Sequence, residues 1–135
     1  MAVLKSETTP LRSADDIVRA RQIVRQWAIQ QGFSLVDQTK LVTATSELAR
    51  NTVNYGGGGA LQLEALLNEG SRRGLRLTFE DHGPGIPDIE LALKDGYTTS
   101  NGMGLGLGGA RRLVNEFEIT SRLGEGTRIC LTKWG

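Results

Sequence analysis

The sequence has little of several features that would indicate common classes of function. It contains one cysteine in 135 residues, so no disulfide can form within the chain. The 16 basic and 15 acidic residues give a net charge of +1, which argues against nucleic acid or an anionic membrane as partner. No apolar run reaches the length of a membrane-spanning helix, and the amino terminus lacks an apolar segment of signal-peptide length. We therefore expect a soluble, cytoplasmic protein that binds neither nucleic acid nor membrane.

Specific catalytic motifs are missing as well. No G-K-S or G-K-T occurs, which excludes a P-loop. The only histidine, His82, directly follows Asp81 on an expected turn, where adjacent side chains seldom face one another, so we reject a hydrolytic triad. No histidine on a separate helix could accept a phosphoryl group from the chain itself. The lone Cys130 lies in an apolar I-C-L run and is expected to be a half-buried strand residue rather than a nucleophile.

Glycine is abundant, with 18 residues, and it is clustered at 56–59, 83–85 and 102–109. Clustered glycine marks places where the backbone turns sharply or approaches a ligand closely.

The apolar pattern predicts one α+β domain over residues 1–135. Ser13 is the expected cap of a helix that continues to Gly32, and a second helix is expected from Asp37 to Tyr55 with Leu41, Ala44, Leu48 and Ala49 as its apolar side. The other expected elements are strands at 2–9, 60–68, 74–81, 116–122 and 127–133, a short helix after Pro87 and Asp88, a loop at 95–105 and a helix at 106–115. This order favours helices over one face of a mixed, mostly antiparallel sheet.

The second helix has one polar stripe. Glu47, Arg50, Asn51 and Asn54 follow each other at offsets of three, four and seven residues. Asn51 could bind a magnesium ion already held by phosphate oxygens and water, and Glu47 could accept the proton of an attacking hydroxyl. Taken alone, such a stripe is more often the solvent face of a surface helix.

Asp81 ends an apolar strand and is followed by Gly83 and Gly85 in D-H-G-P-G. A buried carboxylate there could accept a hydrogen bond from the adenine amino group, which guanine lacks at that position. The alternative is a turn that simply ends the strand.

The third glycine cluster contains a G-x-G-x-x-G match at Gly104, Gly106 and Gly109. No strand precedes it, so we reject a dinucleotide-binding fold. A glycine loop that leads into a helix can still hold phosphate oxygens with backbone N–H groups, and Thr98 and Thr99 could add donors.

Four segments together resemble the ATP-site boxes of the GHKL superfamily, which includes gyrases, chaperones and histidine kinases. They are E-L-A-R-N at 47–51, D-H-G-P-G at 81–85, G-M-G-L-G-L-G at 102–108 and G-E-G-T at 124–127. The resemblance spans nearly the whole chain. The short length and the lack of a phosphoacceptor histidine resemble the anti-sigma regulatory kinase branch, and the run G-M-G-L-G-L-G-G-A-R-R-L-V-N-E-F-E-I is similar to its switch serine/threonine kinases.

This resemblance implies a two-layer Bergerat sandwich that uses ATP and Mg²⁺, with Asn51 on magnesium and Glu47 as the catalytic acid/base residue. It also implies that Asp81 and Thr127 lie near adenine. The residues expected at the ATP site are Arg50, Asn51, Asp81, Gly83, Gly85, Ile86, Thr98, Thr99, Gly102, Gly104, Leu105, Gly106 and Thr127. Asn54 stands where many histidine kinases have lysine, so the cation beside the phosphates is unassigned between Arg50 and Arg111.

The resemblance further implies a serine/threonine kinase whose substrate is a STAS-domain antagonist protein, and whose second partner is a metal-dependent phosphatase in a stress-signalling cascade. Two alternatives use the same residues. One is a non-catalytic, nucleotide-dependent anti-sigma or partner-binding switch, and the other is a slow ATPase without a protein substrate. Glu47 favours the kinase, because nucleotide sensing alone needs no base. The sequence does not give the oligomeric state.

Overall fold

The computed structural model describes residues 1–94 and 106–135. Five strands form one sheet in the order β1-β2-β3-β5-β4, and every neighbouring pair is antiparallel. The strands are β1 (Ala2–Leu11), β2 (Gly59–Leu67), β3 (Arg73–Asp81), β4 (Glu116–Arg122) and β5 (Gly126–Trp134). The mostly antiparallel sheet predicted from the sequence is confirmed, and it contains no parallel pair between the described strands.

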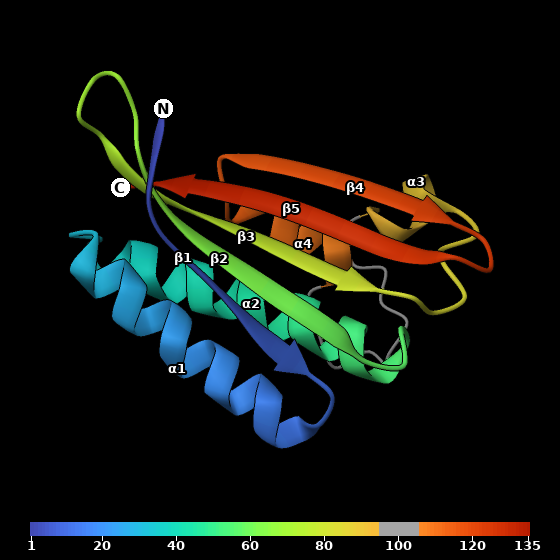
Figure 1. Cartoon of the computed structure of the whole chain (residues 1–135). Coiled ribbons are helices and arrows are strands. Elements are labelled where there is room, and N and C mark those ends of the chain that lie inside the picture. Colours follow the sequence, from blue (N-terminus) through green and yellow to red (C-terminus); the bar gives the residue numbers. More distant parts are fainter. Residues whose placement is uncertain (95–105) are drawn as a thin grey trace.

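The helices form a second layer on one face of this sheet (Figure 1). They are α1 (Ala14–Gln30), α2 (Leu35–Asn54), α3 (Ile89–Ala92) and α4 (Gly106–Arg112). Helix α2 packs between α1 and α4 and crosses the middle of the sheet. The fold is therefore the two-layer α+β sandwich that the sequence predicts. No helix within the described residues is long and apolar enough to cross a membrane.

Short polar side chains set where the helices begin. The Ser13 hydroxyl accepts a hydrogen bond from the Asp16 backbone N–H at 3.4 Å, and Ser34 accepts one from Asp37 at 3.1 Å. Asp88 does the same for α3, with its Oδ1 3.0 Å from the Leu91 nitrogen. Each of these contacts satisfies a backbone donor that the first turn leaves without a partner.

The core lies between the two layers, and α2 contributes its centre. Leu41, Ala44, Leu48 and Ala49 are fully buried, as their helical spacing predicts. Burying one leucine side chain contributes about 1.5–3 kcal/mol to folding. This buried apolar stripe sets how α2 is rotated about its own axis. The stripe that contains Glu47 and Asn51 therefore lies on a different side of the helix from Leu41, Ala44, Leu48 and Ala49.

The start of α2 and the end of α4 differ from the prediction for reasons that the structure shows. Helix α2 begins at Leu35, two residues earlier than expected, because Ser34 is its cap. Helix α4 ends at Arg112 and not at 115, because Asn115 already pairs with β5: its N–H donates to the Thr132 carbonyl at 3.0 Å, and its Oδ1 accepts from the Trp134 N–H at 2.7 Å. The loop predicted at 95–105 lies outside the described residues.

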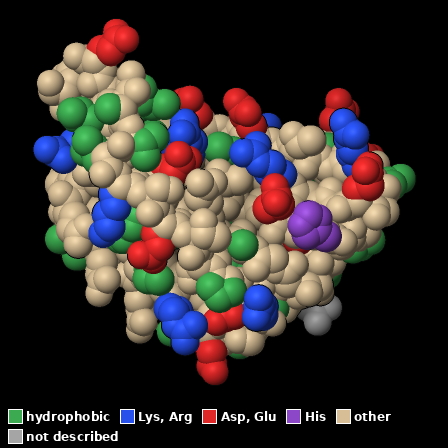
Figure 2. Space-filling model, in the orientation of Figure 1, with side chains coloured by type: hydrophobic (Ala, Val, Ile, Leu, Met, Phe, Trp, Pro, Cys, Tyr) green, Lys and Arg blue, Asp and Glu red, His purple; other side chains and the backbone are tan. Residues whose placement is uncertain are grey.

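The outer face of the sheet is polar, and charged side chains of both signs are interspersed on the face of the molecule seen in Figure 2. The strongest pair on the sheet joins β2 to β3. Arg76 donates from Nε and Nη2 to the two carboxylate oxygens of Glu64, at 2.8 and 3.0 Å. These hydrogen bonds from Arg76 hold the pKa of Glu64 below its ordinary value of 4.5.

The Glu64–Arg76 pair predicts a pH-dependent contribution to stability. Because the folded pKa of Glu64 is lowered, its contribution is present above pH 4.5 and is lost as the pH falls through the folded pKa. We expect Glu64→Gln to lower the free energy of unfolding by about 1 kcal/mol or less at pH 7 and to have no effect in strong acid. Urea unfolding of both proteins from pH 7 to pH 2 measures this, and a difference that stays constant across the range would contradict it.

Candidate active site

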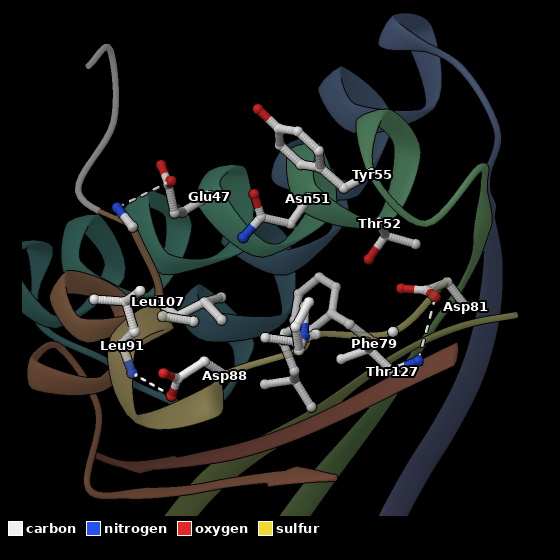
Figure 3. Close-up of a pocket in the computed structure, with 16 residues that line it drawn as sticks. Glu47, Asn51, Thr52, Tyr55, Phe79, Asp81, Asp88, Leu91, Leu107 and Thr127 are labelled. Atoms are coloured by element: carbon white, nitrogen blue, oxygen red, sulfur yellow. Dashed lines mark hydrogen bonds between the residues drawn. The ribbon is translucent and has the colours of Figure 1, made fainter. Parts of the chain in front are cut away.

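A cavity of about 410 Å³ lies between α2 and the ends of β3 and β5, with α3 and α4 closing its other side (Figure 3). This volume falls within the range of small-molecule sites. The cavity is lined by Glu47, Asn51, Thr52, Tyr55, Phe79, Asp81, Gly85, Ile86, Pro87, Asp88, Leu91, Ala92, Gly106, Leu107, Thr127 and Ile129. Polar groups from three motifs that are far apart in the sequence therefore meet around one cavity.

Glu47 lies where α2 approaches the first residue of α4. Its side chain is only 7% exposed, and its Oε1 accepts a hydrogen bond from the Gly106 N–H at 3.0 Å. Gly106 has a φ of +71°, a conformation that glycine adopts without strain. The carboxylate Oε2 is paired with Arg50, whose Nη1 lies 3.2 Å away. Glu47 is thus not on the solvent face of a surface helix, which was the alternative interpretation.

Asn51 lies one helical turn after Glu47 and also lines the cavity. Figure 3 shows its side chain between those of Glu47 and Tyr55, on the wall that α2 forms. Its amide oxygen is the kind of uncharged oxygen ligand that Mg²⁺ accepts together with phosphate oxygens and water. The residues of this wall therefore fit a magnesium-bound triphosphate.

Asp81 lies at the opposite end of the cavity, at the last residue of β3. One carboxylate oxygen, Oδ1, accepts hydrogen bonds from the Gly83 N–H at 2.9 Å and the Thr127 N–H at 3.2 Å. These bonds fix the orientation of the carboxylate, and its Oδ2 has no hydrogen-bond partner among residues 1–94 and 106–135. Asp81 can therefore offer one fixed acceptor to a ligand in the cavity.

Thr127 and Ser121 extend this fixed arrangement. The β3–β5 register places Thr127 opposite Asp81, and its Oγ1 lies 2.9 Å from the Ser121 hydroxyl on β4. Ser121 also accepts a hydrogen bond from the Ile86 N–H at 2.7 Å. Sequence reasoning missed Ser121, because a serine on an edge strand carries no signal until the register of the sheet is known.

Apolar side chains form the floor of the cavity. The β3–β5 register pairs Phe79 with Ile129, two residues from the Asp81–Thr127 pair and therefore on the same face of the sheet. A flat apolar ring such as adenine fits against such a surface. The lining residues that the sequence reasoning missed are Thr52, Tyr55, Phe79, Pro87, Asp88, Leu91, Ala92, Leu107 and Ile129. Strand alternation places Phe79 and Ile129 on the same face as Asp81 and Thr127, but it gives the same signal for every core residue of these strands.

Of the nine predicted site residues that the structure describes, seven lie around the cavity. Glu47, Asn51, Asp81, Gly85, Ile86, Gly106 and Thr127 all line the cavity. Gly83 and Arg50 do not: Gly83 contributes only its N–H to Asp81, and Arg50 contacts Glu47. The predicted positions Thr98, Thr99, Gly102, Gly104 and Leu105 lie outside the described residues.

Gly56 is a further residue on which the Asp81 carboxylate depends. A Cβ atom at this position would overlap the Asp81 side chain, including its Oδ2. We expect Gly56→Ala to displace the carboxylate and to weaken ATP binding by about ten-fold or more, since a hydrogen bond to a charged group contributes about 1.5–3 kcal/mol. Calorimetric titration with ATP measures this change. Gly70→Ala is the control, because a Cβ there meets only ordinary contacts, and an unchanged affinity of the Gly56 variant would contradict the prediction.

Comparison with known proteins places this geometry in a family. Residues 36–134 match the family described as histidine kinase-, DNA gyrase B-, and HSP90-like ATPase. The chain is 49% identical over 119 residues to the serine/threonine-protein kinase RsbT of Bacillus subtilis, covering 88% of this chain and 89% of that protein. It is 29% identical over 123 residues to an anti-sigma F factor of a Thermoanaerobacter species, covering 85% and 82% of the two chains.

Among solved structures, the RsbU and RsbW domains of a Mycobacterium tuberculosis protein share the fold with a TM-score of 0.64 at 21% sequence identity. That alignment covers 96% of this chain and 32% of the longer one. The match to the family extends over all the site residues on α2, β3, α4 and β5. The chain therefore belongs to the histidine kinase-, DNA gyrase B- and HSP90-like ATPase family, as a homologue of the serine/threonine-protein kinase RsbT.

Proposed function

We propose that this chain is a protein serine/threonine kinase that transfers the γ-phosphoryl group of ATP to a hydroxyl of a STAS-domain antagonist protein. The observation that carries this proposal is the position of Glu47. A buried carboxylate lies on the same cavity wall as Asn51, at the end opposite to Asp81. A protein that only senses nucleotide has no need of a carboxylate at that place.

The two ends of the cavity bind different parts of ATP. Asp81 accepts a hydrogen bond from the exocyclic amino group of adenine, while Phe79 and Ile129 contact the ring. The triphosphate then extends along α2 toward Glu47 and the first residue of α4. Asn51 is the protein ligand of a magnesium ion, which when bound neutralises the charge of the phosphates.

Glu47 acts as the base. The hydroxyl oxygen of the acceptor serine or threonine attacks the γ-phosphorus, its proton passes to the Glu47 carboxylate, and ADP leaves. The carboxylate can do this because each of its oxygens has a second lone pair besides the one used by Gly106 or Arg50. From the similarity to RsbT we further propose that the partners are proteins of a partner-switching system. The second partner that we propose is a metal-dependent phosphatase.

The direct test is incubation of the protein with labelled ATP, magnesium and a panel of purified STAS-domain proteins. We expect label on a serine or threonine of one of them, and no transfer when magnesium is chelated. Nucleotide-dependent binding of a STAS-domain protein without any label on it would favour the non-catalytic switch. Phosphate release without labelling or binding of any partner would favour the slow ATPase.

A further inference from the structure

Both oxygens of the Glu47 carboxylate are held by protein donors. Oε1 accepts from the Gly106 backbone at 3.0 Å and Oε2 from Arg50 Nη1 at 3.2 Å. The first donor is part of the backbone at the start of α4. The second is a side chain that can be exchanged without altering the chain path, so its contribution to the position of Glu47 can be measured.

Arg50 differs from the other polar residues of the stripe in its location. It lies three residues after Glu47 on α2, its side chain is 36% exposed, and it is not part of the cavity wall. Within residues 1–94 and 106–135, it is the one cationic side chain that forms an ion pair with Glu47. The guanidinium therefore contacts the carboxylate from outside the cavity.

This arrangement restricts the conformations of Glu47. A glutamate side chain on a helix has several allowed rotamers, and a charge-assisted hydrogen bond favours the one in which its oxygen meets the donor. A proton-accepting group must lie within hydrogen-bond reach of the attacking hydroxyl, and a displacement of about 1 Å can cost about 100-fold in rate. The Arg50–Glu47 pair therefore matters more for the rate of phosphoryl transfer than for the stability of the fold, to which an i,i+3 pair contributes little.

We propose that Arg50 is a positioning residue that holds the Glu47 carboxylate toward the phosphate end of the cavity, and that it does not bind ATP itself. The inference rests on the proposed function, because it requires Glu47 to act as the base. It differs from the expectation drawn from the sequence, in which Arg50 is part of the ATP-binding set. The two assignments predict opposite kinetic results: loss of a positioning residue lowers kcat, and loss of a phosphate ligand weakens nucleotide affinity.

The test is a double-mutant cycle with the wild-type chain, Arg50→Gln, Glu47→Gln and the double variant. Two quantities are measured for each protein: kcat for label transfer from ATP to a STAS-domain acceptor, and affinity for Mg²⁺–AMPPNP by calorimetry. We expect Arg50→Gln to lower kcat by about ten-fold while the AMPPNP affinity stays within about two-fold. We expect the double variant to be no slower than Glu47→Gln, because without the base there is nothing left to position. Arg50→Lys should recover part of the rate.

Arg19→Gln is the matched control. Arg19 forms an i,i+3 pair with Asp16 at 3.0 Å on α1, away from the cavity, so its loss should not change transfer. The proposal is overturned if Arg50→Gln leaves kcat unchanged, if it weakens AMPPNP binding ten-fold or more at unchanged kcat, or if the two substitutions lower kcat multiplicatively. These results leave the role of Glu47 intact. Wild-type transfer by Glu47→Gln would instead overturn the proposed function.

Discussion

Glu47→Gln is expected to abolish most phosphoryl transfer while leaving ATP bound. A positioned general base contributes about 10²–10⁴-fold to rate, and glutamine cannot accept the proton of the acceptor hydroxyl. Its carbonyl oxygen can still accept the Gly106 N–H, so the contact between α2 and α4 is retained. We therefore expect kcat to fall by about 100-fold or more and the Kd for ATP to change by less than a few-fold.

The measurement is single-turnover transfer of label to the STAS-domain acceptor, together with a nucleotide titration of the same preparation. Glu69→Gln is a suitable control, because Glu69 is exposed in the turn between β2 and β3, at the far end of β3 from Asp81. Transfer by the Glu47 variant at the wild-type rate would remove this residue from the mechanism. Loss of ATP affinity in parallel with rate would show that the substitution had damaged the site as a whole.

Asp81→Asn is expected to weaken nucleotide binding itself. The asparagine oxygen can keep the bonds from the Gly83 and Thr127 N–H groups, but its NH₂ then takes the place of Oδ2. That NH₂ would face the adenine amino group, so two donors would meet where a donor and an acceptor met before. We expect ATP affinity to fall by about 10- to 100-fold, in line with the 1.5–3 kcal/mol of a charged hydrogen bond.

The same variant should lose its preference for ATP over GTP, since guanine presents a carbonyl oxygen at the position where adenine has its amino group. Competition titrations with both nucleotides measure this. Glu80→Gln is the neighbouring control, because Glu80 points to the outer face of the sheet, where it lies 3.7 Å from Arg128. Unchanged ATP affinity in the Asp81 variant would refute the assignment of this carboxylate to adenine.

Much of the fold could be predicted from local chemistry in the sequence. Ser13 and Gly32 bound the first helix because capping and helix termination depend on neighbouring residues only. The apolar stripe of α2 was readable for the same reason, since helical spacing alone determines which side chains share a face. The end of α4 could not be predicted from the sequence. Asn115 lies beyond the helix and pairs with β5, and that contact depends on the tertiary arrangement.

The site could be predicted where a charged residue, an asparagine or a glycine stands in a recognisable motif. Glu47, Asn51 and Asp81 were found in this way, whereas Phe79 and Ile129 have the same alternation as any core residue of a strand. Arg50 could not be assigned from its spacing, because an i+3 position on a helix allows contact either with Glu47 or with a ligand. Only the position of its guanidinium beside Glu47, outside the cavity, favours the first of these.

The central claim is that Glu47, Asn51 and Asp81 serve one nucleotide, with adenine at one end of the cavity and the phosphates at the other. A crystal structure with AMPPNP and Mg²⁺ tests it most directly. The account predicts the adenine amino group at hydrogen-bond distance from Asp81, the metal coordinated by the Asn51 amide oxygen, and the terminal phosphate nearest to Glu47. A nucleotide bound in the reverse direction, or a metal without Asn51 in its coordination shell, would contradict it.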